Sequence, residues 1–538
     1  MLPRVLVIAG SDSSGGAGLE ADQRVLTAHG VYSLTATTGL TAQNTLGVQD
    51  IHVVPAAFVG KQINAALEDV GADVVKLGML SSAETVDVIA EELKKHIVKT
   101  IVLDPVMIST SGSQLLPQDA IQHVRTNLLP LTTVLTPNIP EAKLLLENAG
   151  GSPVSEPQNV NEMIELAKKV QRLGAKAVLL KGGHLPFTSE RVRANSTEEA
   201  RIVIDVLYSA ADVENGEEEV LMLTETEFSR SKNTHGTGCS LASAIAANLA
   251  KGNDLKTSVR SAIKYVEAGI KLSVDMGQGS GPIHHFHSLY SMPFAPGQFV
   301  DYVLNRSDMR PIWHRFTHHP FVQGLGDGTL PLKNFKDYLV QDYLYLVHFA
   351  RSNALASYKA RTMKSIAASA RIVLHINTET ALHIDYCASF GLTREEMEAT
   401  PEKQGLRHPL PFLSSSLTNK SWGKACVAYS RYILDIGQSE DWLALQVALA
   451  PCLIGYGAIA RRLYDDADHT VQGEENNRYW KWIENYVAED YVTAVKTGSA
   501  LLEEHMHQVS PSRVEELVGI FKRATELEIG FWDMGLEE

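Results

Sequence analysis

The pattern of hydrophobic and polar positions changes along the chain, and the change falls near residue 300. Before that point, short and mostly continuous apolar runs, rich in β-branched residues, alternate with stretches of helical spacing. Continuous apolar runs are typical of strands buried on both faces, so the alternation predicts βαβ units around a mostly parallel sheet. The predicted strands cover residues 5–9, 33–37, 74–77, 101–103, 133–135 and 177–180, and the predicted helices cover 83–95, 161–172 and 255–272.

After residue 300 the strand pattern disappears, and long helical patterns with many aromatic residues take its place. Phe335, Tyr338, Asp342, Tyr345 and Phe349 follow one another at steps of three and four, so they share one face of a helix. That face is aromatic except for one carboxylate. The second half is therefore predicted to be an all-α bundle with polar groups directed into its core.

The segment 277–297 lacks periodicity and is rich in Gly, Ser, Pro and His, which indicates a connection between domains. His284, His285 and His287 in this connection could bind a metal ion. No carboxylate or cysteine accompanies them, so a plain linker is the favoured interpretation. Two charged stretches are predicted to be surface loops, 188–201 and 211–220.

Composition and charge narrow the class of protein. A chain of 538 residues is too long for a single hydrophobic core, so two or three domains are expected. The chain has 48 Lys and Arg against 63 Asp and Glu, and the net charge of −15 disfavours a general nucleic-acid binder. The four cysteines form no CxxC pair, so neither a zinc site nor a disulfide framework is indicated, and a reducing, cytoplasmic location is expected.

Two apolar segments bear on targeting. The start of the chain, 1–10, is interpreted as a first strand rather than a signal peptide, because it runs into glycine with no small-residue cleavage site. The longest apolar stretch, 447–460, is interrupted by Pro451 and two glycines and is too short to span a membrane. No membrane association is therefore expected.

The segment from Asn233 to Cys239 is the most informative local motif. Its sequence, Asn-Thr-His-Gly-Thr-Gly-Cys, runs directly into a helix of small residues. Bare backbone N–H groups and the positive end of the helix dipole make such a start an anion site, and glycines let the backbone approach a ligand closely. A phosphate bound here would bring the chemistry to Cys239. The alternative is a glycine-rich helix start without a ligand.

A second glycine-rich loop, residues 10–18, follows the first predicted strand. It lacks the Gly-Lys-Ser/Thr ending of a Walker A loop and the features of a dinucleotide-binding GxGxxG site. Asp22 follows at a spacing that lets it face back into the loop. Ligands of parallel sheets bind beyond the carboxyl ends of the strands. Polar segments follow the predicted strands there, at 10–18, 78–79, 104–105, 138–141 and 182–184.

In order, these segments resemble the hydroxymethylpyrimidine and hydroxymethylpyrimidine-phosphate kinases of thiamine synthesis, within the ribokinase superfamily. The resemblance covers roughly residues 3–290 and implies an α/β ribokinase-like domain that uses ATP to phosphorylate 4-amino-5-hydroxymethyl-2-methylpyrimidine and then its monophosphate. The motifs are Gly-Ser-Asp-Ser-Ser-Gly-Gly-Ala-Gly at 10–18, Lys-Leu-Gly-Met-Leu at 76–80, Leu-Asp-Pro-Val-Met at 103–107, Thr-Pro-Asn-Ile-Pro-Glu at 136–141, Lys-Gly-Gly-His at 181–184 and His-Gly-Thr-Gly-Cys at 235–239.

The resemblance implies roles for individual residues. An aminopyrimidine has an amidine-like edge with which a carboxylate or an amide can pair. The phosphoryl group would lie in an anion hole of backbone N–H groups, and Mg²⁺ would rely on few protein ligands. The implied residues are Asp22, Gln43, Met79 and Val106 for the pyrimidine; Lys181, Gly236, Thr237 and Gly238 for the nucleotide phosphates; and Asp104, Asn138 and Glu141 for Mg²⁺.

Cys239 departs from the common pattern of the superfamily, because most ribokinase-like enzymes have an aspartate base at this position. A helix N-terminus lowers the pKa of a thiol, so a thiolate base is one interpretation of Cys239. A cysteine that fills the pocket while electrostatics stabilise the phosphates is the other. Cys239 is therefore a candidate catalytic residue with two possible roles.

Motifs in the second half resemble the TenA-type thiaminase II family, over about residues 305–538. The family fold is a heme-oxygenase-like helical bundle without heme, and its members are usually oligomeric, which suggests a tetramer. The motifs are His-Pro-Phe-Val-Gln-Gly at 319–324, Asp-Gly-Thr-Leu at 327–330, Gln-Asp-Tyr-Leu-Tyr-Leu at 341–346, Ala-Pro-Cys-Leu at 450–453 and Glu-x-x-Phe-Trp at 528–532.

By motif, Cys452 would be the nucleophile that adds to the electron-poor pyrimidine ring. The group on the exocyclic methylene then leaves and water replaces it. Glu528 would be the acid–base residue, with a pKa raised by its aromatic neighbours, and Asp342 would bind the aminopyrimidine edge. Tyrosines that would stack on the ring or hydrogen-bond around it, unless they only pack in the core, are Tyr345, Tyr429, Tyr456 and Tyr486. Cys387 and Cys426 are interpreted as packing residues.

The two resemblances converge on one small aminopyrimidine. They imply a bifunctional thiamine synthesis and salvage enzyme, as in fungal fusions, with a kinase domain at 1–285, a linker at 286–304 and a TenA-type domain at 305–538. ATP and Mg²⁺ would be its cofactors, aminopyrimidines its ligands and a homo-oligomer its assembly. Thiamine and amino-hydroxymethylpyrimidine both remain possible hydrolase substrates. The alternative is a pyridoxal-type kinase joined to a non-catalytic regulatory or assembly module.

Overall fold

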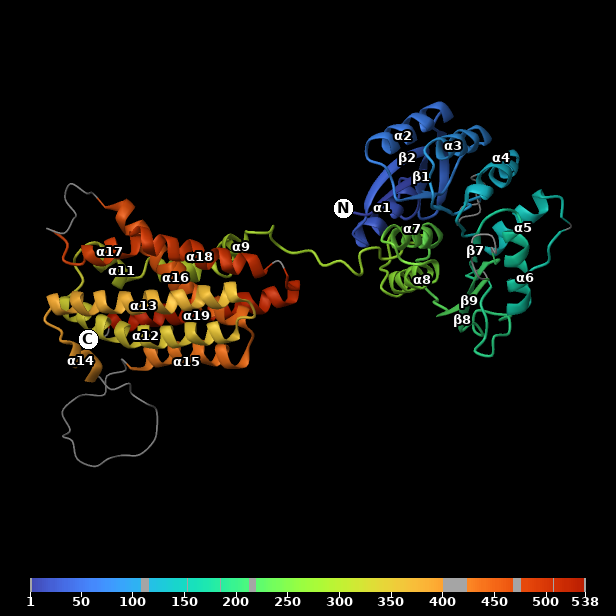
Figure 1. The fold of residues 1–538 in the computed structure, drawn as a ribbon. Coiled ribbons are helices and arrows are strands. Elements are labelled where there is room, and N and C mark those ends of the chain that lie inside the picture. The colour runs from blue at the N-terminus through green and yellow to red at the C-terminus, as the bar shows by residue number, and fades with distance from the viewer. Residues whose placement is uncertain are drawn as a thin grey trace. The chain divides into compact units, whose positions relative to one another are not determined.

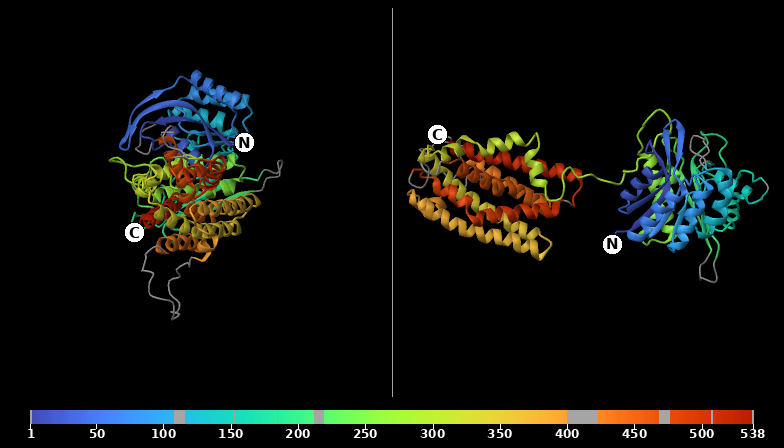
Figure 2. Two further views of the ribbon diagram at one scale, coloured as in Figure 1. Left: turned by 90° about the vertical axis from the view of Figure 1, so that its left-hand side faces the viewer. Right: turned by 90° about the horizontal axis from the view of Figure 1, so that it is seen from above.

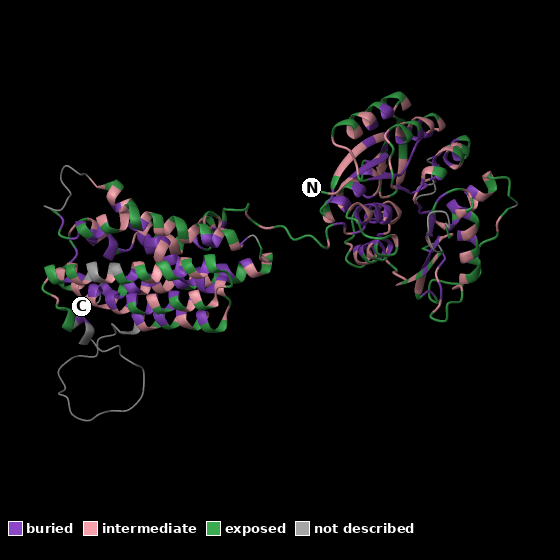
Figure 3. Ribbon diagram, viewed as in Figure 1, coloured by how far each residue is buried: buried purple, intermediate pink, exposed green. Residues whose placement is uncertain are grey.

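The chain forms two compact units in the computed structural model, Met1–Leu289 and Tyr290–Glu538. The structure describes residues 2–107, 116–151, 153–183, 185–211, 219–399, 423–467, 476–506 and 508–536. The first unit combines strands and helices, and the second is helical (Figure 1). Each unit has a buried interior of its own (Figure 3).

The strands of the first unit form one sheet in the order β3-β2-β1-β4-β5-β6-β7-β8-β9. Neighbouring strands from β2 through β1, β4, β5 and β6 to β7 pair in parallel, whereas the β2–β3, β7–β8 and β8–β9 pairs are antiparallel. The mostly parallel sheet and all six predicted strands are thus confirmed, and β3, β8 and β9 are additional. The strands are β1 (Arg4–Asp12), β2 (Tyr32–Asn44), β3 (Gly47–Val53), β4 (Val74–Leu77), β5 (Ile101–Leu103), β6 (Val134–Leu135), β7 (Ala177–Leu180), β8 (Ile202–Ser209) and β9 (Val220–Glu227).

Helices cover both faces of the sheet (Figures 1 and 2). Successive residues of a strand point to opposite faces, so in β1 Val5 and Val7 belong to one core and Leu6 and Ile8 to the other. The first core is closed by α1 (Gly18–Ala28), α7 (Thr237–Ala250) and α8 (Leu255–Lys271). The second is closed by α2 (Ala56–Asp69), α3 (Ala83–Lys95), α4 (Gln118–His123), α5 (Ile139–Asn148) and α6 (Val160–Gln171). The three predicted helices correspond to α3, α6 and α8.

The carboxyl ends of the parallel strands meet at one edge of this sheet, as βαβ topology requires. Polar segments follow them: Gly78 follows β4, Asp104 follows β5, Asn138 follows β6 by two residues and Lys181 follows β7 directly. Asn138 and Lys181 form an isolated parallel bridge beyond β6 and β7. His184, the last residue of one sequence motif, lies outside the described residues.

The second unit consists of helices alone over its described residues, which confirms the predicted all-α bundle. The predicted face of Phe335, Tyr338, Asp342, Tyr345 and Phe349 is buried on α12. The helices are α9 (Phe299–Asn305), α10 (Arg310–Thr317), α11 (Pro320–Gly326), α12 (Leu332–Lys359), α13 (Met363–Ser389), α14 (Arg394–Ala399), α15 (Gly423–Ser439), α16 (Trp442–Asp466), α17 (Trp480–Val487), α18 (Glu489–Met506) and α19 (Pro511–Leu536).

The connection between the units differs in extent from the predicted linker at 286–304. Its last residues, from 299 on, belong to helix α9, whose first N–H groups, those of Phe299 and Val300, donate to the Glu503 carboxylate at 2.9 Å each. Phe299 is fully buried in the core of the second unit. The linker therefore ends before α9. The composition of 277–297 gave no signal for where packing resumes.

Helix α16 has the length and apolar composition that a membrane crossing would need, unlike the shorter stretch considered from sequence. Pro451 lies inside this helix without ending it, so the apolar segment continues in both directions. In its most apolar window, 78% of the residues are buried inside the second unit. Burial of that kind is what a core helix of a bundle requires, and α16 carries Cys452 in its middle.

Candidate active sites

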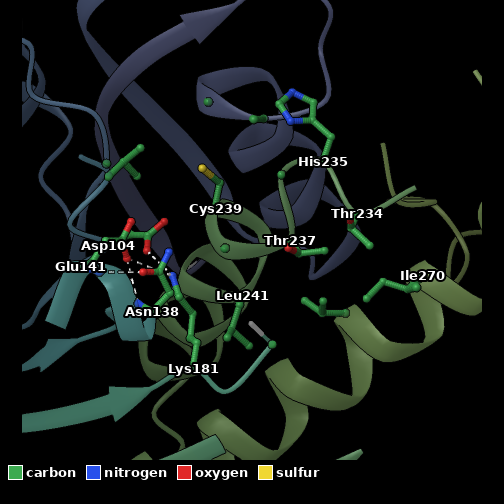
Figure 4. A pocket seen from close by; sticks show the side chains of 18 of the residues that line it. Asp104, Asn138, Glu141, Lys181, Thr234, His235, Thr237, Cys239, Leu241 and Ile270 are labelled. Atoms are coloured by element: carbon green, nitrogen blue, oxygen red, sulfur yellow. Dashed lines mark hydrogen bonds and ion pairs between the residues drawn. The ribbon is translucent and has the colours of Figure 1, made fainter. Parts of the chain in front are cut away.

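The first unit contains a cavity of about 630 Å³ at the carboxyl edge of the sheet (Figure 4). The loop after β1, the ends of β4 to β7, the strands β8 and β9 and the helices α7 and α8 contribute to its wall. Residues predicted from sequence that line it are Gln43, Met79, Asp104, Val106, Asn138, Glu141, Lys181, Gly236, Thr237, Gly238 and Cys239. The cavity therefore brings together segments more than 200 residues apart in the sequence.

The loop before α7 has the geometry of an anion site. Gly236 is the N-cap of α7 with φ of +77°, and no side chain caps the first turn, so its N–H groups remain available to a ligand. A Cβ atom on Gly236 would lie 1.9 Å from the carbonyl oxygen of Gly16. The left-handed conformation and this close approach both require glycine.

Lys181 places a positive charge beside this loop. Its Nζ lies 2.8 Å from Oδ1 of Asp104 and 4.0 Å from Oε2 of Glu141. A Cβ atom on Gly238 would lie 3.1 Å from the same Nζ, so the ammonium group contacts the start of α7. Burial lowers the pKa of Lys181, but Asp104 and Glu141 outweigh burial and raise it above its usual value. Lys181 is therefore charged at neutral pH.

Asn138 and Glu141 form the start of α5 by a reciprocal capping box. Glu141 N donates to Oδ1 of Asn138, and Asn138 N donates to Oε2 of Glu141, both at 2.8 Å. Burial raises the pKa of Glu141 to about 7, although Lys181 opposes the rise. Within the described ranges, no group of three or more His, Cys, Asp and Glu side chains is arranged to hold a metal ion. Asp104, Asn138 and Glu141 therefore do not form a preformed protein cage.

Asp22 differs from its predicted position as a residue that contacts the pyrimidine. Its carboxylate is fully buried, accepts hydrogen bonds from Lys76 Nζ at 2.8 Å and Ser243 Oγ at 2.7 Å, and does not line the cavity. Lys76 stands between Asp22 and the cavity and is itself a lining residue. Asp22 therefore contacts Lys76, a cation for which the sequence analysis gave no role although it lies inside a quoted motif.

Asp12 and His235 form a second ion pair at the cavity, and neither had a predicted role. Asp12 Oδ2 lies 2.8 Å from Nε2 of His235, and Gln43 Nε2 lies 3.2 Å from the same nitrogen. Burial raises the pKa of Asp12, but hydrogen bonds from His235, Ser14 and Ala17 outweigh burial and lower it to about 2. Because Asp12 is ionised, its carboxylate oxygen is the acceptor in this contact. The pair joins the loop 10–18 to the loop 233–239 before α7, here called the anion loop, at a point next to Gln43.

Cys239 lies in the first turn of α7 and faces the cavity (Figure 4). Burial raises the pKa of its thiol to about 12, although Lys76 opposes the rise and Asp22 adds to it. The helix start was expected to lower this pKa, but desolvation dominates here. At neutral pH the Cys239 side chain is a thiol in this structure.

The second unit gathers its candidate residues around Glu528 on α19. Burial raises the pKa of Glu528 to about 8, Asp342 adds to the rise, and Tyr429 and Cys452 lie close enough to lower it in part. The Tyr429 hydroxyl and the Cys452 thiol interact with the Glu528 carboxyl group, and the Tyr345 hydroxyl interacts with that of Tyr429. A buried cluster of titratable groups with shifted pKa values has the character of a functional site.

The aromatic residues form the walls of this cluster. Tyr345 and Tyr429 stack with ring centroids 5.0 Å apart, and Tyr456 packs between Tyr486 at 5.2 Å and Trp532 at 5.3 Å. Asp342 is buried on the predicted aromatic face of α12, and burial raises its pKa to about 7 although Tyr338 lowers it in part. All seven residues predicted for this site belong to one cluster. Tyr338 and Trp532 were not predicted, because an aromatic residue at helical spacing also fits a packed core.

Comparisons with known proteins follow the same division of the chain. A family model described as phosphomethylpyrimidine kinase matches residues 12–284, and one described as TENA/THI-4/PQQC family matches residues 306–424 and 412–538. A Schizosaccharomyces pombe protein named "Putative hydroxymethylpyrimidine/phosphomethylpyrimidine kinase 2" is 40% identical over 533 residues, covering 99% of this chain and 91% of the relative.

Two further similarities concern a full-length relative and a solved structure. The Saccharomyces cerevisiae "Hydroxymethylpyrimidine/phosphomethylpyrimidine kinase THI21" is 33% identical over 570 residues, covering 100% of this chain and 96% of the relative. The crystal structure of phosphomethylpyrimidine kinase from Clostridium difficile is 35% identical, covers 49% of this chain and 97% of its own, and has a TM-score of 0.39.

Proposed function

We propose a function from the premise that this chain belongs to the phosphomethylpyrimidine kinase family and, in its second half, to the TENA/THI-4/PQQC family. The chain is a bifunctional enzyme of thiamine metabolism, with a kinase domain followed by a TenA domain. The kinase phosphorylates hydroxymethylpyrimidine and its monophosphate with ATP. The TenA domain hydrolyses an aminopyrimidine to hydroxymethylpyrimidine. The observation that carries the kinase activity is the contact of the Lys181–Asp104 pair with the glycine loop in one cavity.

In the kinase site the protein supplies position and charge. The backbone N–H groups of Gly236, Thr237 and Gly238 would stabilise the charge that develops on the transferring phosphoryl group. Lys181, whose Nζ contacts Asp104 and the start of α7, would neutralise phosphate charge. Gln43, Met79 and Val106 would hold the pyrimidine so that its hydroxymethyl oxygen faces the phosphate. Asp22 would keep Lys76 charged and fixed in the wall.

We propose Cys239 as a protonated neighbour of the reacting atoms rather than a thiolate base, because burial raises the pKa of its thiol to about 12. Phosphoryl transfer through a loose transition state needs little proton abstraction before the bond to the leaving oxygen breaks. A thiol in the first turn of α7 fills the pocket and leaves the N–H groups free for the phosphate.

The residues near Lys181 fit a magnesium ion bound mainly through phosphate and water. Asp104 Oδ2 faces Gly238, where a Cβ atom would lie 3.6 Å away, and Glu141 is a buried carboxyl group that a cation would help to ionise. Asp104 and Glu141 would hold Mg²⁺, with Asn138 ordering Glu141 by the capping box. Bound Mg²⁺ would supply charge neutralisation on the phosphates, and few protein ligands suffice for it.

In the hydrolase site, Cys452 would add through its sulfur to the ring carbon beside the substituted position. Addition breaks the aromaticity of the ring, and the bond between the exocyclic methylene and its amine breaks as Glu528 donates a proton to the leaving nitrogen. Water then adds to the methylene and gives a proton to the Glu528 carboxylate, and the C–S bond breaks to restore the ring and the thiolate. Asp342 would bind the amidine edge, while Tyr345, Tyr429, Tyr456 and Tyr486 surround the ring.

The remaining features of the proposal concern setting and assembly. The ligands are small aminopyrimidines, and the net charge of −15 supports neither nucleic-acid nor anionic-membrane binding. Cys239, Cys387, Cys426 and Cys452 are all free, which supports a reducing, cytoplasmic location. A homo-oligomer, most simply a tetramer, is proposed from the family of the second half.

The first test is to incubate the purified chain with amino-hydroxymethylpyrimidine, Mg²⁺ and ATP, and to follow ammonia and pyrimidine phosphates by mass spectrometry. We expect ammonia together with the monophosphate and the diphosphate. Phosphorylation of pyridoxal in preference to hydroxymethylpyrimidine, measured in direct competition, would instead favour the alternative kinase. Absence of ammonia with continued phosphorylation of hydroxymethylpyrimidine would contradict the proposed hydrolase.

Replacing Glu528 by glutamine should reduce hydrolysis about 10²- to 10⁴-fold, because the amide cannot donate the proton that the leaving nitrogen needs. In the unmodified protein, hydrolysis should fall as pH rises through the Glu528 pKa of about 8, since the carboxylate no longer donates. The residual activity of the variant should lack this fall, as a pH–rate profile from pH 6 to 10 would reveal.

Glu528→Gln should also make the stability of the folded protein less dependent on pH, which separates a catalytic role from a structural one. The pKa of Glu528 is raised from 4.5 to about 8 in the folded state, so the folded protein holds a proton that the unfolded chain releases between these values. Stability therefore declines as pH rises through this window, and Glu528→Gln should reduce the decline in melting temperature. A variant that loses activity and is also less stable at pH 8 would argue for a structural role.

A further inference from the structure

Residues 281–287, here called the strap, lie after α8, close to the end of the first unit at Leu289. Composition marks them as linker, yet they are anchored on α8. His284 N donates to the carbonyl oxygen of Gly269 at 2.9 Å, the Tyr265 hydroxyl donates to the carbonyl oxygen of His285, and His287 Nε2 lies 3.0 Å from the carbonyl oxygen of Tyr265. The strap is therefore a packed part of the first unit.

The first residues of the strap, Gly281 and Pro282, also contact the anion loop. His235 N donates to the carbonyl oxygen of Gly281 at 3.1 Å, and His235 pairs with Pro282 in a parallel bridge. His235 directly precedes Gly236, and its side chain is held by Asp12. The backbone that enters the left-handed turn is thus fixed by the strap, while the side chain is fixed by the loop 10–18.

A second contact reaches the first turn of α7. His285 Nε2 lies 3.1 Å from Oγ of Ser240, and both side chains are buried, with residue exposures of 3% and 0%. Ser240 follows Cys239 and is the fourth residue of α7. Because no side chain caps this helix start, its orientation depends on such lateral contacts.

We propose that residues 281–285 of the strap are a positioning element of the kinase site, and that His285, through Ser240, is a positioning residue for phosphoryl transfer. This inference rests on the proposed kinase function. N–H groups that stabilise a transition state act only when they are held within a fraction of an ångström of the developing charge. The strap contacts both sides of the anion loop, at His235 and at Ser240, and among the described residues none of its hydrogen bonds reaches Gln43, Met79 or Val106.

The test compares His285→Leu, Ser240→Ala and their combination in the full chain. Each single variant should lower kcat for phosphorylation about 10- to 100-fold and change KM for hydroxymethylpyrimidine less than about 3-fold, since only the phosphate geometry shifts. The double variant should be no worse than the more affected single variant, because both changes remove one contact. His285→Gln, whose amide can reach the imidazole Nε2 position, should restore most of kcat.

His287→Leu is the matched control, because His287 contacts Tyr265 of α8 and has no recorded hydrogen bond to α7. It should keep kcat within about 3-fold of the unmodified chain. Hydrogen exchange of the peptide covering 234–241 should quicken in His285→Leu and Ser240→Ala but not in His287→Leu. Hydrolysis by the second unit should be unchanged in all of these variants.

Specific results would overturn the proposal. Unchanged kcat in His285→Leu, strictly additive losses in the double variant, or equal losses in His287→Leu would each contradict a positioning role of His285. If the unmodified chain phosphorylates pyridoxal instead, the same comparison is made with pyridoxal. If it phosphorylates neither ring, the proposed function fails, and unaltered exchange at 234–241 would then reject the strap separately.

Discussion

Cys452→Ser is expected to lower aminopyrimidine hydrolysis at least about 10³-fold and to leave kinase activity unchanged. A serine hydroxyl is a far weaker nucleophile than a cysteine sulfur, and Glu528, with its pKa raised to about 8, is protonated at neutral pH and cannot activate the hydroxyl as a base. Ammonia release from amino-hydroxymethylpyrimidine and phosphorylation of free hydroxymethylpyrimidine, measured on the same preparation, check both parts of the expectation.

Cys426→Ser is the matched control, because Cys426 is buried in the same unit and its Sγ lies 3.7 Å from the carbonyl oxygen of Gln341, to which a serine could also donate. It should retain hydrolysis within about 5-fold of the unmodified protein. More than a tenth of the original hydrolysis in Cys452→Ser would contradict covalent catalysis. Loss of both activities would contradict the independence of the two sites.

Most of the strands that could be predicted from sequence are buried on both faces of the sheet. β1, β5 and β7 contain continuous apolar runs, and β4 is apolar except for Lys76, because helices cover both faces of the sheet. β3 mixes polar with apolar residues and is largely exposed at the sheet edge, and β9 changes from four apolar residues to alternating Thr and Glu. β8 contains the buried Asp205, whose carboxylate accepts Gly182 N at 2.8 Å. In β3 and β9 tertiary pairing decides the structure and local hydrophobicity gives little signal, whereas β8 is an apolar run that only Asp205 interrupts and that the sequence analysis missed.

In the candidate site, too, sequence motifs predicted which loops meet, but they did not predict how deeply each side chain is buried. Motifs identified the loops that meet at the cavity, because parallel topology brings the carboxyl ends of strands to one edge. Asp22 and Lys76 come from two such motifs, yet sequence spacing does not tell which of the two faces the ligand and which lies behind it. For Cys239, a local argument from the helix start predicted a lowered pKa, and burial in the folded protein reversed it.

His285 shows where sequence analysis gives no signal. It lies in a segment rich in Gly, Ser, Pro and His, and its partner Ser240 is 45 residues away in the chain. The three histidines of this segment suggested a metal site or a plain linker. In the structure, His285 and His287 instead hydrogen-bond to α7 and α8, respectively. This contact depends on where the chain runs after α8, which the composition of the segment does not predict.

Gly236→Ala is expected to lower the kinase kcat at least about 10²- to 10³-fold while hydrolysis continues, because the substitution displaces the anion loop itself. At φ of +77° an alanine costs roughly 1–2 kcal/mol of conformational energy. Its Cβ would also lie 1.9 Å from the carbonyl oxygen of Gly16, so either the loop 10–18 or the start of α7 must move. Movement of either one separates the N–H groups from the phosphate. Steady-state kinetics with ATP and hydroxymethylpyrimidine would measure the resulting fall in kcat.

Gly30→Ala separates the effect of strain from the effect of geometry. Gly30 has φ of +67° and open space where a Cβ would lie, and it stands at the end of α1 away from the cavity wall. It should lower stability by about the same 1–2 kcal/mol of conformational strain, seen as a lower melting temperature, and keep kcat within about 2-fold. If Gly236→Ala were as active as Gly30→Ala, the close approach of Gly236 to Gly16 would be irrelevant to catalysis. A selective kinase loss in Gly236→Ala would instead locate phosphoryl transfer at this loop, since both variants carry similar backbone strain and only one disturbs the anion site.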